Sequence, residues 1–402
     1  MGQVGVVHPI ARAWLTTGGT GAQNYDEFAD EAEITAIIAA NPRSALAVEM
    51  PHRAPDSLGP DLQAALPAAV ARLAEAKAAG GYAPAEQVVV LYRITGTDGE
   101  SSYGMFCAVD TDQISTSADQ PGLVIRNEDV FEEKVRERVA LAEATGHLLS
   151  PVLLLQSARG AELQEALVAA CRAAGPAAAR DLDPAGRVHE IWPVAAGPAA
   201  AALCRLAGGG ELVVADGNHR SLAAQTGGLS RFLAVVTTPE SVTIQPYNRL
   251  VLEVPSDALR DDRLAARLPG ARIEDVGELP DPLRRGTVYL YRPGRVTAVT
   301  MPPDPAAAPV ENLDHALVER LLVRGAFELD PGDKRVVYVG GDYPVSWLRA
   351  EVDAGRAEAA ILIAPVGVHD FVAVNLARQK LPRKSTWFTP KARAGLVLAE
   401  LG

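Results

Sequence analysis

Residues 211–221, Glu-Leu-Val-Val-Ala-Asp-Gly-Asn-His-Arg-Ser, constrain the fold more than any other part of this chain. An apolar run leads directly into a polar turn with a glycine, and a helix start follows. This order predicts a strand, a turn and a helix, which is typical of α/β proteins. Unbonded N–H groups and the positive dipole end of the helix favour an anion there, and Arg220 adds a planar, bidentate donor.

This turn has two interpretations. In the functional one, Gly217, His219 and Arg220 cradle a phosphate, and Asp216 holds a metal ion or the loop itself. In the structural one, the same residues only reverse the chain. Asp216 would then make an Asx turn, Asn218 or Ser221 would cap the helix, and Arg220 would form a surface ion pair.

Length and composition bound the class of protein. A chain of 402 residues exceeds one ordinary core, so two or three domains are expected. With 48% apolar and 22% charged residues, the composition is that of a folded globular protein. The net charge of −12 disfavours nucleic acid as a partner, because polyanions need clustered lysine and arginine.

The sequence also bears on location. Cys107, Cys171 and Cys204 are far apart and lack metal-ligand spacing, so they are expected to be reduced and buried. No apolar run approaches the roughly 20 residues of a membrane span, and no signal-peptide pattern begins the chain. A cytoplasmic protein without a membrane partner is therefore expected.

The pattern of elements predicts three segments. Residues 1–115 are expected to be α+β, with extended segments at 45–50 and 87–94, a helix at 61–79 and a hairpin at Asp98-Gly99. Residues 116–255 carry the clearest strand and helix alternation, including a helix that starts at Asp129 and ends at Gly146. Residues 256–402 alternate again and predict a second α/β domain.

Two further places offer chemistry. Glu128 lies where a short strand meets a helix, and a carboxylate there can act as general base or simply complement the helix dipole. Near the C-terminus, residues 381–391 place three cations among hydroxyls and the aromatics Trp387 and Phe388. That cluster fits an anion or nucleotide contact and, equally, the packing of an interface.

Several ordered blocks together resemble a known family. They are Tyr25-Asp26, Glu128 before a charged helix, Ser150-Pro151, the 216–220 turn, Pro246-Tyr247-Asn248-Arg249-Leu250-Val251, and Pro382-Arg383-Lys384-Ser385-Thr386-Trp387-Phe388 with Pro390-Lys391. In this order the blocks resemble the bacterial family catalogued as domain of unknown function 1015. Its central region is similar to the ParB/sulfiredoxin fold, which includes free-serine kinases.

The resemblance implies a mixed α/β (α+β) fold with a central ParB/sulfiredoxin-like domain at 116–255. It also implies a kinase that moves a phosphoryl group from ATP or ADP, with Mg²⁺, to the hydroxyl of a small amino acid such as serine. Catalysis would fall to Glu128, Asp216 and His219, with Asp216 also placing the metal. The nucleotide would be held by Gly217, Asn218, Arg220, Ser221, Arg249, Lys384 and Ser385, with Arg383 a weaker candidate.

The chain departs from the family pattern at three positions, where it has asparagine instead of histidine. Asn127, Asn218 and Asn248 stand where the family shows histidine, and an amide cannot shuttle protons as imidazole can. These departures leave room for a nucleotide-binding regulator without turnover, or for a scaffold with a vestigial pocket. The net negative charge of the chain disfavours a ParB-like nucleic-acid-binding module. The sequence leaves the oligomeric state open, and a homodimer is among the possibilities.

Overall fold

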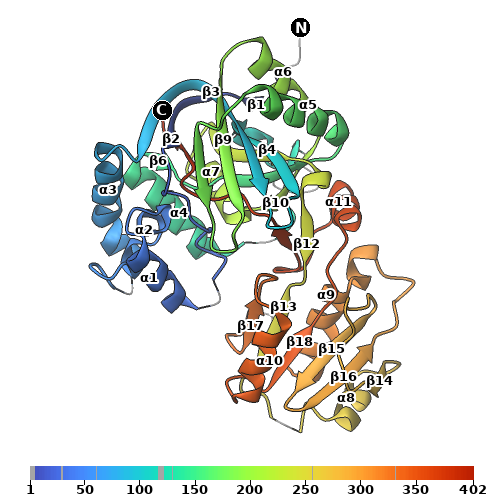
Figure 1. Cartoon of the computed structure of the whole chain (residues 1–402). Helices are drawn as coiled ribbons and strands as arrows, with labels where there is room; N and C mark the ends of the chain where they lie inside the picture. The colour runs from blue at the N-terminus through green and yellow to red at the C-terminus, as the bar shows by residue number, and fades with distance from the viewer. Residues whose placement is uncertain are drawn as a thin grey trace. The chain divides into compact units, whose positions relative to one another are not determined.

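The computed structural model describes residues 5–28, 30–59, 61–115, 122–128, 130–255, 257–330 and 332–402. The chain divides into two compact units, one formed by Met1–Thr243 with Pro390–Gly402 and the other by Ile244–Thr389 (Figure 1). The domain boundary predicted at residue 115 falls inside the first unit, where strands from both sides of it pair in one sheet. The boundary predicted at 255 lies near the start of the second unit.

The first unit is built on one sheet. Its strands are β1 (Val7–His8), β2 (Ile10–Thr16), β3 (Tyr82–Thr95), β4 (Ser101–Asp110), β5 (Val124–Ile125), β6 (His147–Leu148), β7 (Val152–Gln156), β8 (Ala179–Leu182), β9 (Val188–Ala195), β10 (Leu212–Asp216), β11 (Arg231–Thr237) and β20 (Val397–Glu400). Within the described ranges these twelve strands follow the order β5-β10-β7-β11-β4-β3-β2-β20-β6, with β1 on β4 and β9 between β3 and β8. The sheet is mixed, because β10 runs parallel to β5 and antiparallel to β7.

Helices of the first unit gather in two groups, visible in Figure 1. They are α1 (Glu31–Ala40), α2 (Ala45–Glu49), α3 (Leu62–Ala78), α4 (Glu132–Thr145), α5 (Gly160–Ala173), α6 (Pro198–Ala207) and α7 (Asn218–Thr226). Helices α5 and α6 pack on each other and on β3, β4 and β9, whereas α4 packs on both α3 and α7. One apolar core of the unit, which includes Leu154, Leu167 and Val214, is almost fully buried.

The second unit has its own core and sheet. Its strands are β12 (Thr243–Gln245), which begins at the boundary, β13 (Asn248–Val251), β14 (Arg272–Asp275), β15 (Thr287–Arg292), β16 (Arg295–Thr300), β17 (Val336–Val339), β18 (Ala359–Leu362) and β19 (Trp387–Thr389). Six of them pair antiparallel within the described residues, in the order β14-β16-β15-β18-β13-β17. The helices are α8 (Asp261–Arg267), α9 (Asp314–Leu317), α10 (Val345–Asp353) and α11 (Val368–Leu376), with a π-helix at Val318–Ala326.

The mixed α/β class predicted from the sequence is confirmed, and most predicted elements form. Residues 45–50 are an exception, because α2 is a buried helix where an extended segment was expected. The helix predicted after the glycine-containing turn forms and begins at Asn218. Asp129 lies outside the described residues, and α4 has Phe131 as its N-cap. Gly146 ends α4 in the left-handed conformation, as predicted.

All three cysteines are free and buried, as expected. None of the helices in the described ranges is long and apolar enough to cross a membrane.

Candidate functional site

The predicted turn is a single glycine. Strand β10 ends at Asp216, and Gly217 caps α7 with φ +96°, in the left-handed region. A β-carbon at Gly217 would lie 3.1 Å from Nε of Arg220 and 3.2 Å from Cα of Val152. Both the backbone conformation and the close approach therefore require glycine here.

Arg220 points into the protein. Its side chain is buried, and its guanidinium donates through Nη2 to Oδ2 of Asp216 and through Nη1 to the carbonyl oxygen of Pro151 and to Oδ1 of Asn24. Burial alone would lower the pKa of Arg220, but the carboxylates of Asp216 and Asp26 outweigh it and raise that pKa. Arg220 is thus a permanently charged group inside the first unit.

A second cation reaches Asp216 from the C-terminal segment. Nζ of Lys391 donates to Oδ1 of Asp216 at 3.1 Å and lies 3.9 Å from Oε1 of Glu27. Burial would raise the pKa of Asp216, but Lys391 and Arg220 together lower it. Asp216 is therefore an ionised carboxylate that faces one cation with each oxygen.

This arrangement bears on the predicted Mg²⁺ site. Both oxygens of Asp216 already accept from cations, and no cluster of three or more histidine, cysteine, aspartate or glutamate side chains in the described ranges is placed to hold a metal. A hard divalent cation needs oxygen ligands that are not neutralised by neighbouring ammonium or guanidinium groups. The donor set around Asp216 does not fit Mg²⁺, so this geometry does not support the metal role predicted for Asp216.

Glu27 adds a carboxyl group with an unusual pKa. It is buried, and its Oε1 accepts from the backbone N–H of Asn24 at 3.1 Å and from Nδ2 of Asn24 at 2.7 Å. Burial raises the pKa of Glu27 to about 7, although Lys391 lowers it and Asp216 raises it further. A carboxyl group with this pKa can both accept and release a proton near neutral pH.

On the other side of Arg220, Glu49 and Arg138 form a second buried pair. Arg138 lies over the ring of Tyr25, 3.9 Å from its centroid, and both its Nη atoms lie 3.5 Å from the carbonyl oxygen of Glu49. The hydroxyl of Ser150 donates to Oε1 of Glu49. Burial raises the pKa of Glu49 despite the nearby Arg138.

Asn127 and Phe131 lie against the start of α7. Nδ2 of Asn218 donates to Oδ1 of Asn127, and Nε2 of His219 accepts from the N–H of Phe131 at 3.0 Å. The rings of His219 and Phe131 stack with centroids 6.0 Å apart. The structure thereby brings the segment that carries the half-buried Glu128 beside the predicted loop.

Ser221 is fully buried, and its hydroxyl donates to the carbonyl oxygen of Asn218 at 3.0 Å. This bond lies within the first turn of α7, and the N-cap of that helix is Gly217 without a side-chain hydrogen bond, so the helix cap expected from Asn218 or Ser221 does not form.

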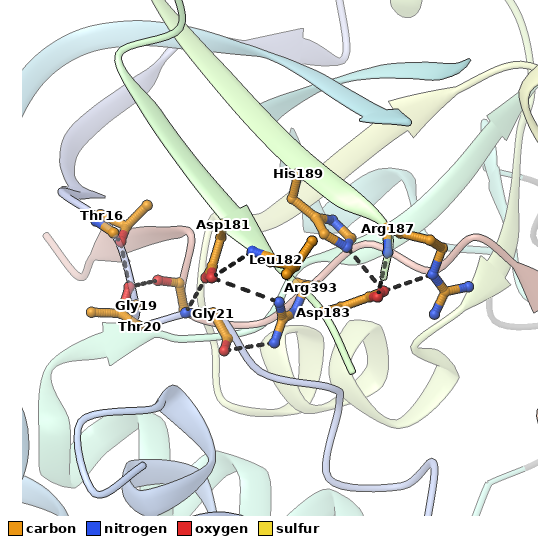
Figure 2. A network of polar contacts seen from close by, with 12 residues as sticks. Thr16, Gly19, Thr20, Gly21, Asp181, Leu182, Asp183, Arg187, His189 and Arg393 are labelled. Atoms are coloured by element: carbon orange, nitrogen blue, oxygen red, sulfur yellow. Dashed lines mark hydrogen bonds and ion pairs between the residues drawn. The ribbon is translucent and has the colours of Figure 1, made fainter. Parts of the chain in front are cut away.

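A polar network fixes the segment that carries Lys391 (Figure 2). Nη2 of Arg393 donates to the carbonyl oxygen of Gly21 at 2.8 Å, and the N–H of Gly21 donates to Oδ2 of Asp181 at 2.9 Å. Oδ2 of Asp183 accepts from Nε of Arg187 at 2.6 Å and lies 3.1 Å from Nε2 of His189. Because Asn24 also donates to the carbonyl oxygen of Ala392, the C-terminal segment is held beside the loop that carries Glu27.

Arg249, Lys384 and Ser385 belong to the second unit. Arg249 is fully buried, where it donates to Oε1 of Glu319 at 3.0 Å and to the carbonyl oxygen of Tyr247 at 2.8 Å. The hydroxyl of Ser385 donates to the carbonyl oxygen of Pro382, and Nζ of Lys384 lies 5.5 Å from the ring centroid of Tyr247. Their assignment to a nucleotide stays a prediction.

Four residues of the site were not singled out from the sequence: Glu27, Glu49, Arg138 and Lys391. Lys391 and Glu27 had partial signals, because Lys391 ends the Pro390-Lys391 block and Glu27 follows Tyr25-Asp26. Glu49 and Arg138 had none, because a charged residue on a short or amphipathic helix normally faces solvent.

Together these elements define a mixed α/β protein with a buried ionic site where a strand, a glycine and a helix meet. The chain belongs to the family described as protein of unknown function (DUF1015), whose model matches residues 20–316. The family resemblance drawn from the sequence blocks is confirmed. No curated protein matches the chain.

Solved structures with a similar chain path are distant. A free serine kinase in complex with AMP is 12% identical, with 71% of this chain and 87% of that chain covered and a TM-score of 0.39. A conserved hypothetical protein from Pyrococcus furiosus is 13% identical (72% and 93% covered, TM-score 0.38), as is SbnI with C-terminal truncation from Staphylococcus aureus (72% and 85%, TM-score 0.39). At these TM-scores the similarity supports no statement about the chemistry of this chain.

Proposed function

We propose that this chain is a nucleotide-dependent phosphotransferase that moves a phosphoryl group from ATP or ADP to the hydroxyl of a small molecule, with a free amino acid such as serine as the expected acceptor. The observation that carries the proposal is the convergence of Arg220, Lys391 and the N-terminus of α7 on Asp216. Phosphoryl transfer depends mainly on positioning and on neutralising phosphate charge, which the buried Arg220, the half-buried Lys391 and a helix N-terminus provide.

The residues have distinct roles in this proposal. Gly217 lets the backbone approach a phosphate, and the first turn of α7, with Asn218, His219 and Ser221, supplies hydrogen-bond donors. Arg220 and Lys391 neutralise the phosphate oxygens. The phosphate then replaces Asp216 as their anionic partner or shares the two cations with it. We also propose that residues 116–255 form a ParB/sulfiredoxin-like domain.

In the reaction, the acceptor oxygen attacks the terminal phosphorus of the nucleotide. The new O–P bond forms as the bond from that phosphorus to its bridging oxygen breaks, and the nucleotide leaves with one phosphoryl group fewer. The acceptor's proton passes to a carboxylate, for which the sequence indicates Glu128 and the geometry offers Glu27. Glu27 is the stronger candidate, because a pKa of about 7 suits a base near neutral pH.

The test is a product assay. The purified chain is incubated with ATP or ADP and hydroxylated amino acids, with Mg²⁺ and with a chelator, and products are detected by the mass of an added phosphoryl group. Arg220→Ala and Lys391→Met are expected to lose turnover and nucleotide affinity together. Glu27→Gln and Glu128→Gln separate the two base candidates, because only the true base variant loses turnover while it keeps nucleotide affinity. Absence of product from every acceptor would contradict the kinase proposal.

A nucleotide-binding regulator without turnover is the second candidate. It is favoured because Asp216 already accepts a hydrogen bond from each of the two cations, so that a bound phosphate would have to displace an internal carboxylate. Such a displacement would couple nucleotide binding to the position of the segment that carries Lys391. Nucleotide binding that shifts the thermal midpoint, without formation of any product, would support this candidate.

A further inference from the structure

Asn24 lies in a turn beside the C-terminal segment, and its side chain is almost fully buried. The backbone of Ala22 pairs with that of Ala394 through two antiparallel hydrogen bonds, of 3.0 and 3.1 Å. Antiparallel pairing continues in register, so Asn24 lies opposite Ala392. Here the side chain makes the contact, because Nδ2 of Asn24 donates to the carbonyl oxygen of Ala392 at 3.2 Å. Asn24 therefore holds the residue next to Lys391.

Asn24 also binds Glu27 through its backbone and its side chain. The N–H of Glu27 donates to the carbonyl oxygen of Asn24 at 3.1 Å and closes a four-residue turn. In return, Oε1 of Glu27 accepts from the N–H of Asn24 at 3.1 Å and from its Nδ2 at 2.7 Å. Such reciprocal bonding between residues three apart is that of a capping box. The position of the Glu27 carboxyl group thus depends on Asn24.

The orientation of the Asn24 amide follows from its neighbours. Nδ2 faces two acceptors, Oε1 of Glu27 and the carbonyl oxygen of Ala392, whereas Oδ1 accepts from Nη1 of Arg220 at 3.3 Å. A reversed amide would place its oxygen against two oxygens and its nitrogen against a guanidinium, which can only donate. The permitted orientation joins Glu27, Arg220 and the segment that carries Lys391.

The hydrogen bonds from Asn24 determine where Glu27 carries its proton. A carboxyl oxygen has about two lone pairs, and on Oε1 both accept N–H donors of Asn24. The proton of the neutral carboxyl group therefore lies on Oε2. Burial raises the pKa of Glu27 to about 7, and the hydrogen bond from the N–H of Asn24 opposes that rise. Donors to the ionised form lower the pKa of a carboxyl group, so Nδ2 acts in the same direction.

We propose that Asn24 is a positioning residue, which directs proton uptake by Glu27 to Oε2 and holds its carboxyl group beside Arg220. The catalytic part of this inference rests on the proposed function, in which Glu27 is the base. In that reaction the hydroxyl proton of the acceptor passes to Oε2 as the new O–P bond forms and the bridging O–P bond of the nucleotide breaks. Glu27 then returns the proton to solvent.

The test measures the titration of Glu27 in the intact chain, without nucleotide or acceptor. Protein labelled with ¹³C at the glutamate carboxyl carbon is titrated by NMR, and the Glu27 signal is the one missing from Glu27→Gln. Asn24→Leu keeps a side chain branched at Cγ but loses its donor and acceptor. Loss of one hydrogen bond to a charged group is expected to raise the midpoint by about one pH unit or more. An unchanged midpoint would overturn the inference.

Two further variants are controls for a general structural effect. Asn41→Leu removes a donor to the carbonyl oxygen of Gly19 at a more exposed position of the same unit, and is expected to leave the midpoint of Glu27 unchanged. Asn24→Asp keeps an oxygen towards Arg220 but places a carboxylate beside Oε1, so the midpoint is again expected to rise by about one pH unit or more. This variant decides the question if Asn24→Leu does not fold. Equal shifts in Asn41→Leu and Asn24→Leu would show that Asn24 has no specific role.

The pH dependence of kcat/KM separates the inference from the proposed function. A base acts in its ionised form, so the acid limb of the profile is expected to rise in Asn24→Leu by the same number of pH units as the titration of Glu27. Absence of product from the wild type would contradict the proposed function, whereas the titration would still decide the role of Asn24. A titration that shifts while the acid limb stays in place would overturn the catalytic part of the inference.

Discussion

Replacing Glu27 with glutamine tests the electrostatic account of the site directly. Glutamine keeps the oxygen that accepts from Asn24, so the geometry of the loop is preserved, but it cannot ionise. The wild-type carboxyl group has a pKa raised from 4.5 to about 7, chiefly by burial. The variant therefore isolates the free energy of ionising one buried carboxyl group.

The sign follows from proton binding. Between its unfolded and folded pKa values, Glu27 holds a proton in the native state and none in the unfolded state. Stability contributed by this group is therefore lost as pH rises. Each pH unit in that window is worth about 1.4 kcal/mol, so the stability of wild type relative to Glu27→Gln falls by about 3 kcal/mol from about pH 4.5 to about pH 8. Glu49, whose pKa is also raised by burial, is present in both proteins and cancels in the difference.

The assay must report on the first unit, because a chain with two compact units need not unfold in one step. Amide hydrogen exchange of peptides from β7 and β10, read by mass spectrometry and corrected for intrinsic rates, gives the free energy of opening at each pH. Glu75→Gln, which removes an exposed carboxylate, is the control and is expected to follow wild type. Parallel pH profiles for wild type and Glu27→Gln would refute the reasoning.

Three further predictions concern stability and are checked by urea denaturation. Arg220→Ala removes a buried cation from the half-buried Asp216 and is expected to destabilise the first unit by about 3–5 kcal/mol, far more than the loss of a surface ion pair would. Gly217→Ala is expected to cost about 1–3 kcal/mol and more than Gly175→Ala, which also has positive φ but nothing within 4 Å of the added carbon. Arg249→Met leaves a buried glutamate unpaired in the second unit and is expected to destabilise that unit by about 3–5 kcal/mol.

Local structure was largely predictable because it depends on neighbours in sequence. The Asp98-Gly99 turn joins β3 and β4, Gly146 ends α4, and the apolar run before Asp216 is a buried strand. Residues 45–50 show the limit of this reasoning. Short apolar runs do not distinguish a buried strand from a buried helix, and α2 is a helix that buries all five of its residues.

The site was predicted less well because its contacts are long-range. Asp216 and Arg220 are four residues apart on the strand–helix junction, a spacing that normally indicates a surface ion pair. Only the fold reveals that Lys391, 175 positions away, donates to the same carboxylate, and that Arg220 is buried. Sequence spacing reports which groups are neighbours along one element, whereas burial and charge balance depend on segments that meet only in the folded chain.

The charge balance of the site determines how a phosphate can bind there. The buried Arg220 requires an internal anion when no ligand is bound, because an unpaired charge in the interior would destabilise the fold by several kcal/mol. Asp216 provides that anion, so the residue that stabilises the unliganded site is the one that a phosphate must outcompete. Asp216→Asn removes the negative charge that competes with the phosphate. If the loop binds phosphate, we expect this variant to bind nucleotide more tightly and to be less stable without ligand. A variant that is less stable but binds nucleotide no better would show that the cations serve the fold alone.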